Sequence, residues 1–205
     1  MNDRAPPRPI PASLVLLGCA SVLAVHLAVL YTSGADPFAT PVGALSRGED
    51  GNLHGLGLSL LALALAALAA LVHRPGAGWP TRAGQLSLVV DAALVVYLAY
   101  RFASPDADAA VGTGADAPLW LIACVTGLAM GLLVPGLLAT NRAAGRWTLV
   151  CLVLWLALVP PGLFVEPHWR GAYERLVGLT MVGWMAGLAV LVGFTPTEDR
   201  GGADR

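Results

Sequence analysis

Charged residues are scarce in this 205-residue sequence, where Asp, Glu, Lys and Arg together make up 12% of the chain. Soluble domains are about a quarter charged, so an ordinary soluble domain is excluded. The net charge of −1 and the lack of a basic cluster give no support for nucleic-acid binding. Lysine is absent and all twelve basic residues are arginine. Together with the richness in Ala and Gly, this is typical of a bacterial genome of high GC content.

Cysteine is rare and the familiar catalytic motifs are missing. Cys19, Cys124 and Cys151 lie inside apolar runs without CxxC or Cys/His spacing, which argues against a zinc or disulfide framework. No GxSxG, HExxH, phosphate-binding loop or dinucleotide fingerprint occurs. We therefore predict no catalytic residue, no cofactor and no bound metal.

Long apolar runs are what the chain does have, with 57% hydrophobic residues and a mean hydropathy of +0.70. A helix needs about 20 apolar residues to cross about 30 Å of hydrocarbon, and a segment of this length in lipid must be helical. We predict an all-α polytopic integral membrane protein with a six-helix bundle. Its spans are expected at about 10–32, 53–73, 83–103, 117–139, 146–165 and 172–194. Residues 1–9 are predicted to be a short cytoplasmic segment, and 195–205 a disordered cytoplasmic tail.

The placement of arginine predicts the orientation. Eight arginines fall on the side of the two chain ends and four on the other, so both ends are expected in the cytoplasm. The eight are Arg4, Arg8, Arg74, Arg82, Arg142, Arg146, Arg200 and Arg205, and the four are Arg47, Arg101, Arg170 and Arg175. The predicted location is a bacterial cytoplasmic (plasma) membrane, which the chain crosses several times.

Two GxxxG pairs, Gly127 with Gly131 and Gly183 with Gly187, predict close helix contacts. The pattern fits packing within the bundle and also fits the seam of a homodimer. Membrane lipids are the other expected partners, and nucleic acid is not expected.

Asp91 is the most unusual residue, because it lies within about 3 Å of the predicted middle of its span. An ionisable group at that depth costs at least about 2.5–3.5 kcal/mol, so it should face the bundle and have a partner. Two interpretations stay open, a functional site and a neutral, hydrogen-bonded acid that holds helices together.

His26 is predicted about 7 Å to the outer side of the middle, too far from Asp91 for a direct contact in straight helices. Ser59 and Thr180 lie at nearly the same depth, with Thr126 a little deeper. A polar layer of His26, Ser59 and Thr180 is the hypothesis that best matches these depths.

A second polar cluster is expected at the outer surface. His54 begins the second span, Glu174 and Arg175 begin the sixth, and Asp36 lies in the first outer loop. Glu174 falls in the first turn of a helix, where its charge favours the helix dipole, so a structural role is sufficient for it. The spacing of His26, His54 and Glu174 does not argue for a metal site.

Two segments carry a family resemblance, the first outer loop DPFATPVGALSRGEDGNLHG and the opening of the last span, GAYERLVGLTMVGW. They resemble the bacterial and archaeal six-helix membrane proteins grouped as domain-of-unknown-function family 998. The matching residues are Asp36, Pro37, Pro41, Val42 and Leu45 in the loop, and Gly171, Glu174, Arg175, Leu176 and Trp184 in the span. Gly43 stands where the family usually has serine.

The resemblance covers nearly the whole chain and is weakest in the middle. Relatives often have a Phe-Pro-x-Asp-like loop after the third helix and a histidine where the fourth begins, but Ser104–Trp120 contains no histidine. Any site in relatives that uses this histidine is therefore in doubt here. The family implies six helices and a plasma-membrane location, and it supplies no activity.

Three functional classes follow from these observations. The sequence favours an accessory or structural membrane protein, because packing is a sufficient explanation for every polar residue. The alternative is a small proton- or solute-coupled transporter or sensor that uses Asp91, with the face of His54 and Glu174 as its entrance. An intramembrane enzyme acting on a lipid-linked substrate is the third class, for which no nucleophile and base can be named.

Overall fold

The structure is a computed structural model that describes residues 8–45, 51–103 and 116–194. This part of the chain forms six helices that are long and apolar enough to cross a membrane. They are α1 (Pro9–Ser33), α2 (Gly51–Val72), α3 (Trp79–Ala103), α5 (Asp116–Thr140), α6 (Arg142–Leu158) and α7 (Pro167–Gly193). Two 3₁₀ turns, η1 (Val42–Ala44) and η2 (Pro160–Phe164), complete the elements, and the described residues contain no strand. The prediction of an all-helical chain with six such helices is confirmed. The predicted end segments, residues 1–7 and 195–205, lie outside the described part.

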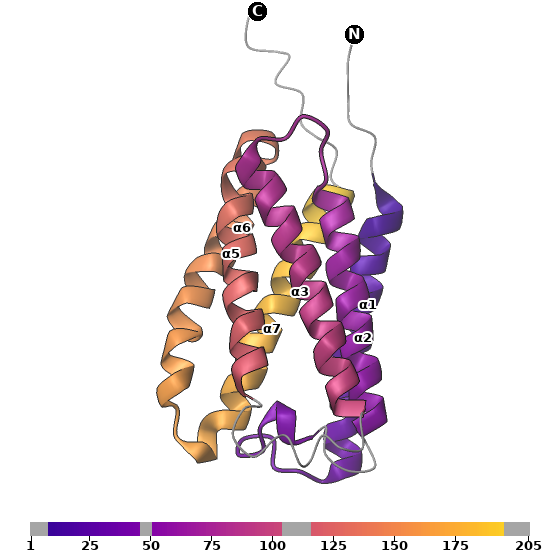
Figure 1. Cartoon of the computed structure of the whole chain (residues 1–205), viewed down its shortest axis with the longest axis vertical. Coiled ribbons are helices and arrows are strands. Elements are labelled where there is room, and N and C mark those ends of the chain that lie inside the picture. The colour runs from indigo at the N-terminus through magenta and orange to yellow at the C-terminus, as the bar shows by residue number, and fades with distance from the viewer. Residues whose placement is uncertain (1–7, 46–50, 104–115, 195–205) are drawn as a thin grey trace, which may run out of the picture.

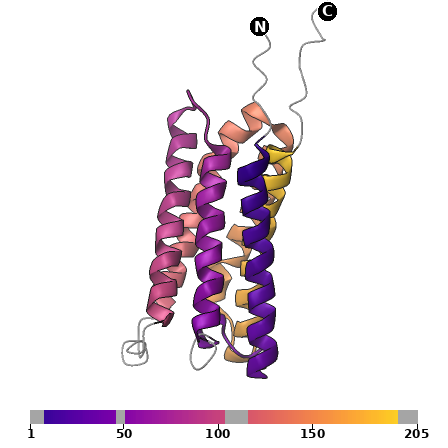
Figure 2. The same ribbon diagram turned by 90° about the vertical axis from the view of Figure 1, so that its right-hand side faces the viewer.

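The helices form a closed ring in chain order, in which each packs on the next and α7 returns to α1 (Figures 1 and 2). α2 also touches α7 across the ring. The beginning of α1 and the end of α7 lie side by side, since a Cβ on Gly193 would come within 2.2 Å of Ala12. We call this end of the bundle the terminal end and the opposite one, which carries η1 and η2, the loop end (Figure 1).

Capping by particular residues explains several of the helix ends. α1 begins at Pro9, whose fixed φ suits a first turn, and ends at Gly34 in the left-handed conformation with φ 60°. Asn141 alone separates α5 from α6, and its side chain accepts a hydrogen bond from Ala144 N at 3.1 Å. The end of α2 is held by Arg8, which donates to the carbonyls of Leu71 and His73.

The fifth predicted span differs from the helix that forms it. The prediction runs from 146 to 165, whereas α6 begins at Arg142 and ends at Leu158. Pro160 and Pro161 follow, and because proline lacks the N–H of a continuing helix, the chain turns into η2. The two prolines therefore mark a helix end.

The core lies between the helices, while large apolar side chains remain exposed around the outside. Leu65, Leu133, Trp184 and Met185 have no exposed surface. The outward residues include Leu27, Leu63, Val153, Leu156 and Phe164, all more than half exposed. An exposed apolar belt is unusual on a soluble monomer and fits contact with lipid acyl chains.

Three of the four GxxxG glycines are used for packing within the chain. A Cβ on Gly127 would lie 3.1 Å from Trp155, one on Gly131 3.9 Å from Leu152, and one on Gly187 2.1 Å from Trp147. All three contacted side chains belong to α6. No atom lies within 4 Å of a Cβ added to Gly183. A homodimer seam stays a prediction, and Gly183 is the only one of the four with open space for it.

Candidate functional site

Asp91 lies on α3 and has no exposed surface. Thr126 of α5, which is equally buried, donates its hydroxyl to Oδ2 of Asp91. The other oxygen, Oδ1, has no hydrogen-bond partner among the described residues. A carboxyl group at this depth was expected to have a partner. That partner is the hydroxyl group of Thr126 on the neighbouring helix α5.

The buried neighbours of Asp91 along α3 are mainly apolar. Ser87, one turn earlier on α3, donates to the carbonyl of Ala83 in its own helix at 3.0 Å. Leu88, Ala92 and Val95 are buried on the same stretch of α3. No ion pair with Asp91 occurs among the described residues. Asp91 therefore joins α3 to α5 through its bond to Thr126.

The three members of the predicted polar layer have separate partners in the structure. Ser59 donates to Gly55 O and Thr180 to Leu176 O, both at 2.9 Å and both within their own helices. His26 accepts a hydrogen bond at Nε2 from Arg175 Nε at 3.1 Å. Serine and threonine in a helix readily bond the carbonyl four residues earlier, which leaves them no need of a partner on another helix.

Arg175 joins three parts of the chain at the loop end. Besides its bond to His26 of α1, its Nη1 donates to the carbonyls of Pro37 at 2.6 Å and Thr40 at 3.0 Å. Its Nη2 is buried and has no hydrogen-bond partner among the described residues. The planar guanidinium, with donors pointing in several directions, suits a contact of this kind.

Glu174 and Gly171 hold the same loop from α7. Because α7 begins at Pro167, Glu174 lies beyond the first turn, so the prediction that it favours the helix dipole there is wrong. Glu174 Oε2 accepts from Val42 N at 2.7 Å, and its Oε1 accepts from Arg170 Nε at 3.2 Å. A Cβ on Gly171 would lie 2.4 Å from the carbonyl oxygen of Thr40, so only glycine permits this approach. We call Gly171, Glu174 and Arg175 with loop residues 37–42 the outer clamp.

Asp36 and His54 lie beside the outer clamp. Asp36 Oδ1 accepts from Phe38 N at 2.8 Å and so shapes its own turn. His54 is buried in the first turn of α2, close enough to His26 for the two rings to interact electrostatically. The structure therefore gathers His26, His54, Asp36, Glu174 and Arg175 at the loop end, and leaves Ser59 and Thr180 apart.

Two features of the site escaped the sequence analysis. Thr126 was expected a little deeper than the layer of His26, Ser59 and Thr180 and was not assigned to Asp91, because depth does not show which helix lies beside α3. The groups that accept hydrogen bonds from Arg175 are backbone carbonyls of an irregular loop. The sequence does not show where such carbonyls point. In the part of the chain that is described, no group of three His, Cys, Asp or Glu residues is arranged to hold a metal.

Comparison with protein-family models, with curated proteins and with solved structures gives no match to this chain. The two segments on which the family resemblance rests meet in the outer clamp, where Gly171, Glu174 and Arg175 contact residues 37–42.

Proposed function

We propose that this chain is an accessory or structural protein of a bacterial cytoplasmic membrane, which it crosses six times with both ends in the cytoplasm. Its ionisable residues support this role because their bonds connect parts of the same chain. Asp91 accepts from Thr126, Arg175 bonds His26 and two loop carbonyls, and Glu174 accepts from Val42. Among the described residues, these bonds hold helices and loops together and leave no catalytic pair.

The enclosure of Asp91 is the observation that carries the proposal. A residue that exchanges protons or solutes with water has to be reached by water in at least one state. Asp91 has no exposed surface and accepts from a side chain that is itself fully buried. A bond between two helices explains this arrangement without a transported substrate.

A small proton- or solute-coupled transporter or sensor is the second candidate. The observation that favours it is the unpartnered Oδ1 of Asp91, which leaves one buried acceptor available to a proton or to a donor group of a solute. In this alternative the bundle opens to water at Asp91 during its cycle.

Access of water to position 91 separates the two candidates. Asp91→Cys is made in a background in which Cys19, Cys124 and Cys151 are alanine, and the purified protein in lipid is treated with a small, charged, water-soluble thiol reagent. Thr126→Cys probes the opposite wall in case the first variant does not fold. Glu166→Cys serves as the exposed control, because the side chain of Glu166 is 74% exposed.

The structural role predicts that both buried cysteines stay unmodified in the folded protein and react only after denaturation. Modification of either one in folded protein at a rate comparable to Glu166→Cys would contradict the structural role and favour the transporter or sensor. Size-exclusion chromatography and circular dichroism establish that each variant is folded before labelling.

A further inference from the structure

Two arginines lie together at the terminal end of the bundle. Arg8 Nη1 donates to Leu71 O at 3.3 Å and Ala70 O at 3.5 Å, and also to His73 O, which fixes its guanidinium at the end of α2. Arg74 follows directly on His73. These carbonyls carry only the partial negative charge of a helix C-terminus, and among the described residues Arg8 has no ion pair.

Arg74 is close enough to Arg8 for their charges to repel. Burial, followed by the charge of Arg8, lowers the pKa of Arg74. Within the described residues, neither arginine has a carboxylate at ion-pair distance. Two neighbouring cations that have no carboxylate partner in the described part of the chain form a site that a negatively charged group would stabilise.

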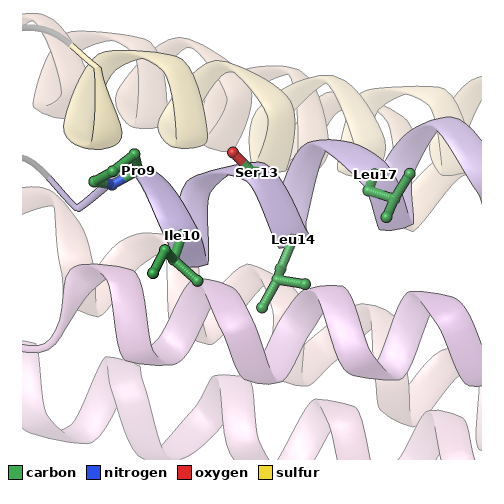
Figure 3. A pocket seen from close by; sticks show the side chains of 5 residues that line it. All are labelled: Pro9, Ile10, Ser13, Leu14 and Leu17. Carbon is green, nitrogen blue, oxygen red and sulfur yellow. The ribbon is translucent and has the colours of Figure 1, made fainter.

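A shallow depression on the exposed face of α1 begins at Pro9, the residue that follows Arg8. It has a volume of about 280 Å³ and is lined by Pro9, Ile10, Ser13, Leu14 and Leu17 (Figure 3). All five residues are exposed, and four of them are apolar. From Pro9 to Leu17 the depression follows the helix for about 12 Å, at 1.5 Å per residue. An apolar surface of this length, open to the side, fits an acyl chain.

We propose that Arg8, Arg74 and this depression form a binding site for an anionic phospholipid. The phosphate of the headgroup lies at the two guanidinium groups, and an acyl chain covers the depression on α1. Charge complementarity decides the occupant, because a zwitterionic lipid offers the same phosphate and apolar chain but adds an ammonium group that the two arginines repel. Basic pockets at the membrane surface recognise anionic headgroups in this way. The proposal rests on membrane insertion and is independent of the role of Asp91.

Native mass spectrometry of the full chain tests the site with two lipids of identical acyl chains, phosphatidylglycerol and phosphatidylcholine. An arginine near an anionic headgroup contributes about 1 kcal/mol, a factor of about five in affinity. Arg74→Gln is therefore expected to weaken phosphatidylglycerol binding about fivefold and phosphatidylcholine binding by less, because the ammonium group of phosphatidylcholine offsets the attraction of its phosphate. Ser13→Phe fills the depression and is expected to weaken both lipids.

Arg142→Gln is the matched control, since it removes one exposed arginine from the start of α6, a helix that does not contact α1. It is expected to leave the preference for phosphatidylglycerol intact. Equal affinity of the unsubstituted protein for the two lipids would overturn the proposal, and so would an equal loss in Arg142→Gln and Arg74→Gln. Neither result bears on the accessibility of position 91, so the two proposals fail separately.

Discussion

At the scale of single residues, the bond between Thr126 and Asp91 links α3 to α5 in the interior of the bundle. A hydrogen bond between two buried groups adds modest net stability, but a buried group that loses its partner costs more, because water cannot replace it. The stability of this site therefore depends on both residues being present or both being replaced.

Thr126→Val keeps the shape of the side chain and removes the donor. We expect it to lower the free energy of unfolding by about 1–3 kcal/mol, because the carboxyl group stays buried without a hydroxyl to bond it. Adding Asp91→Leu should recover much of the loss, since no unpaired polar group then remains. Thermal unfolding of the detergent-purified variants, followed by circular dichroism, measures both effects.

Thr180→Val is the control for this series. Its hydroxyl bonds only the carbonyl of Leu176 in its own helix, at 2.9 Å. Its effect should stay within about 0.5 kcal/mol. If Thr126→Val is no less stable than Thr180→Val, the bond to Asp91 does not hold the bundle together.

At the scale of elements, the outer clamp attaches the loop after α1 to the first turns of α7. The loop backbone offers the carbonyls of Pro37, Phe38 and Thr40, and α7 supplies the donors and the space that glycine leaves. Ala172 N, for example, donates to Phe38 O at 3.0 Å. This contact fixes how α7 closes the ring against α1.

Gly171→Ala should open the outer clamp. The added methyl would lie 2.4 Å from Thr40 O and 2.8 Å from Phe38 O, which are backbone atoms that cannot move alone. We expect a loss of about 1–3 kcal/mol, the usual cost of overpacking, measured as a lower melting temperature.

Gly178→Ala, on the same helix, is the matched comparison because no atom lies within 4 Å of its added Cβ. Alanine is the better helix former by up to about 1 kcal/mol, so this variant should be neutral or more stable. Equal melting temperatures for the two variants would show that the close approach at Gly171 does not matter for stability.

The sequence predicted the elements well and their mutual contacts only in part. Pro, Gly and charged residues bound the apolar runs, so three helices agree with their predicted spans to within two residues. α3 and α7 begin four and five residues earlier than predicted, and Pro160 ends α6 early. The burial of Asp91 was predictable from the cost of a charge in hydrocarbon. Its partner was not, because several hydroxyl groups lie at similar depths and the rotation of each helix decides which one it meets.

At the scale of the whole molecule, the ring places α1's beginning, α7's end and the connections α2–α3 and α5–α6 at one end (Figure 1). Five described arginines lie at this terminal end, namely Arg8, Arg74, Arg82, Arg142 and Arg146. Arg101, Arg170 and Arg175 lie at the loop end, where the last two are bonded to Glu174 and to the outer clamp. This distribution supports the proposed orientation with the terminal end in the cytoplasm.

Labelling of single cysteines in intact cells tests directly whether the chain crosses the membrane six times with both ends in the cytoplasm. In the cysteine-free background, Glu166→Cys places a thiol between α6 and α7, and Ala77→Cys places one between α2 and α3. A maleimide that cannot cross membranes should modify Glu166→Cys in intact cells and Ala77→Cys only after the cells are permeabilised. Modification of both in intact cells, or of Ala77→Cys alone, would contradict a six-span bundle with both ends inside.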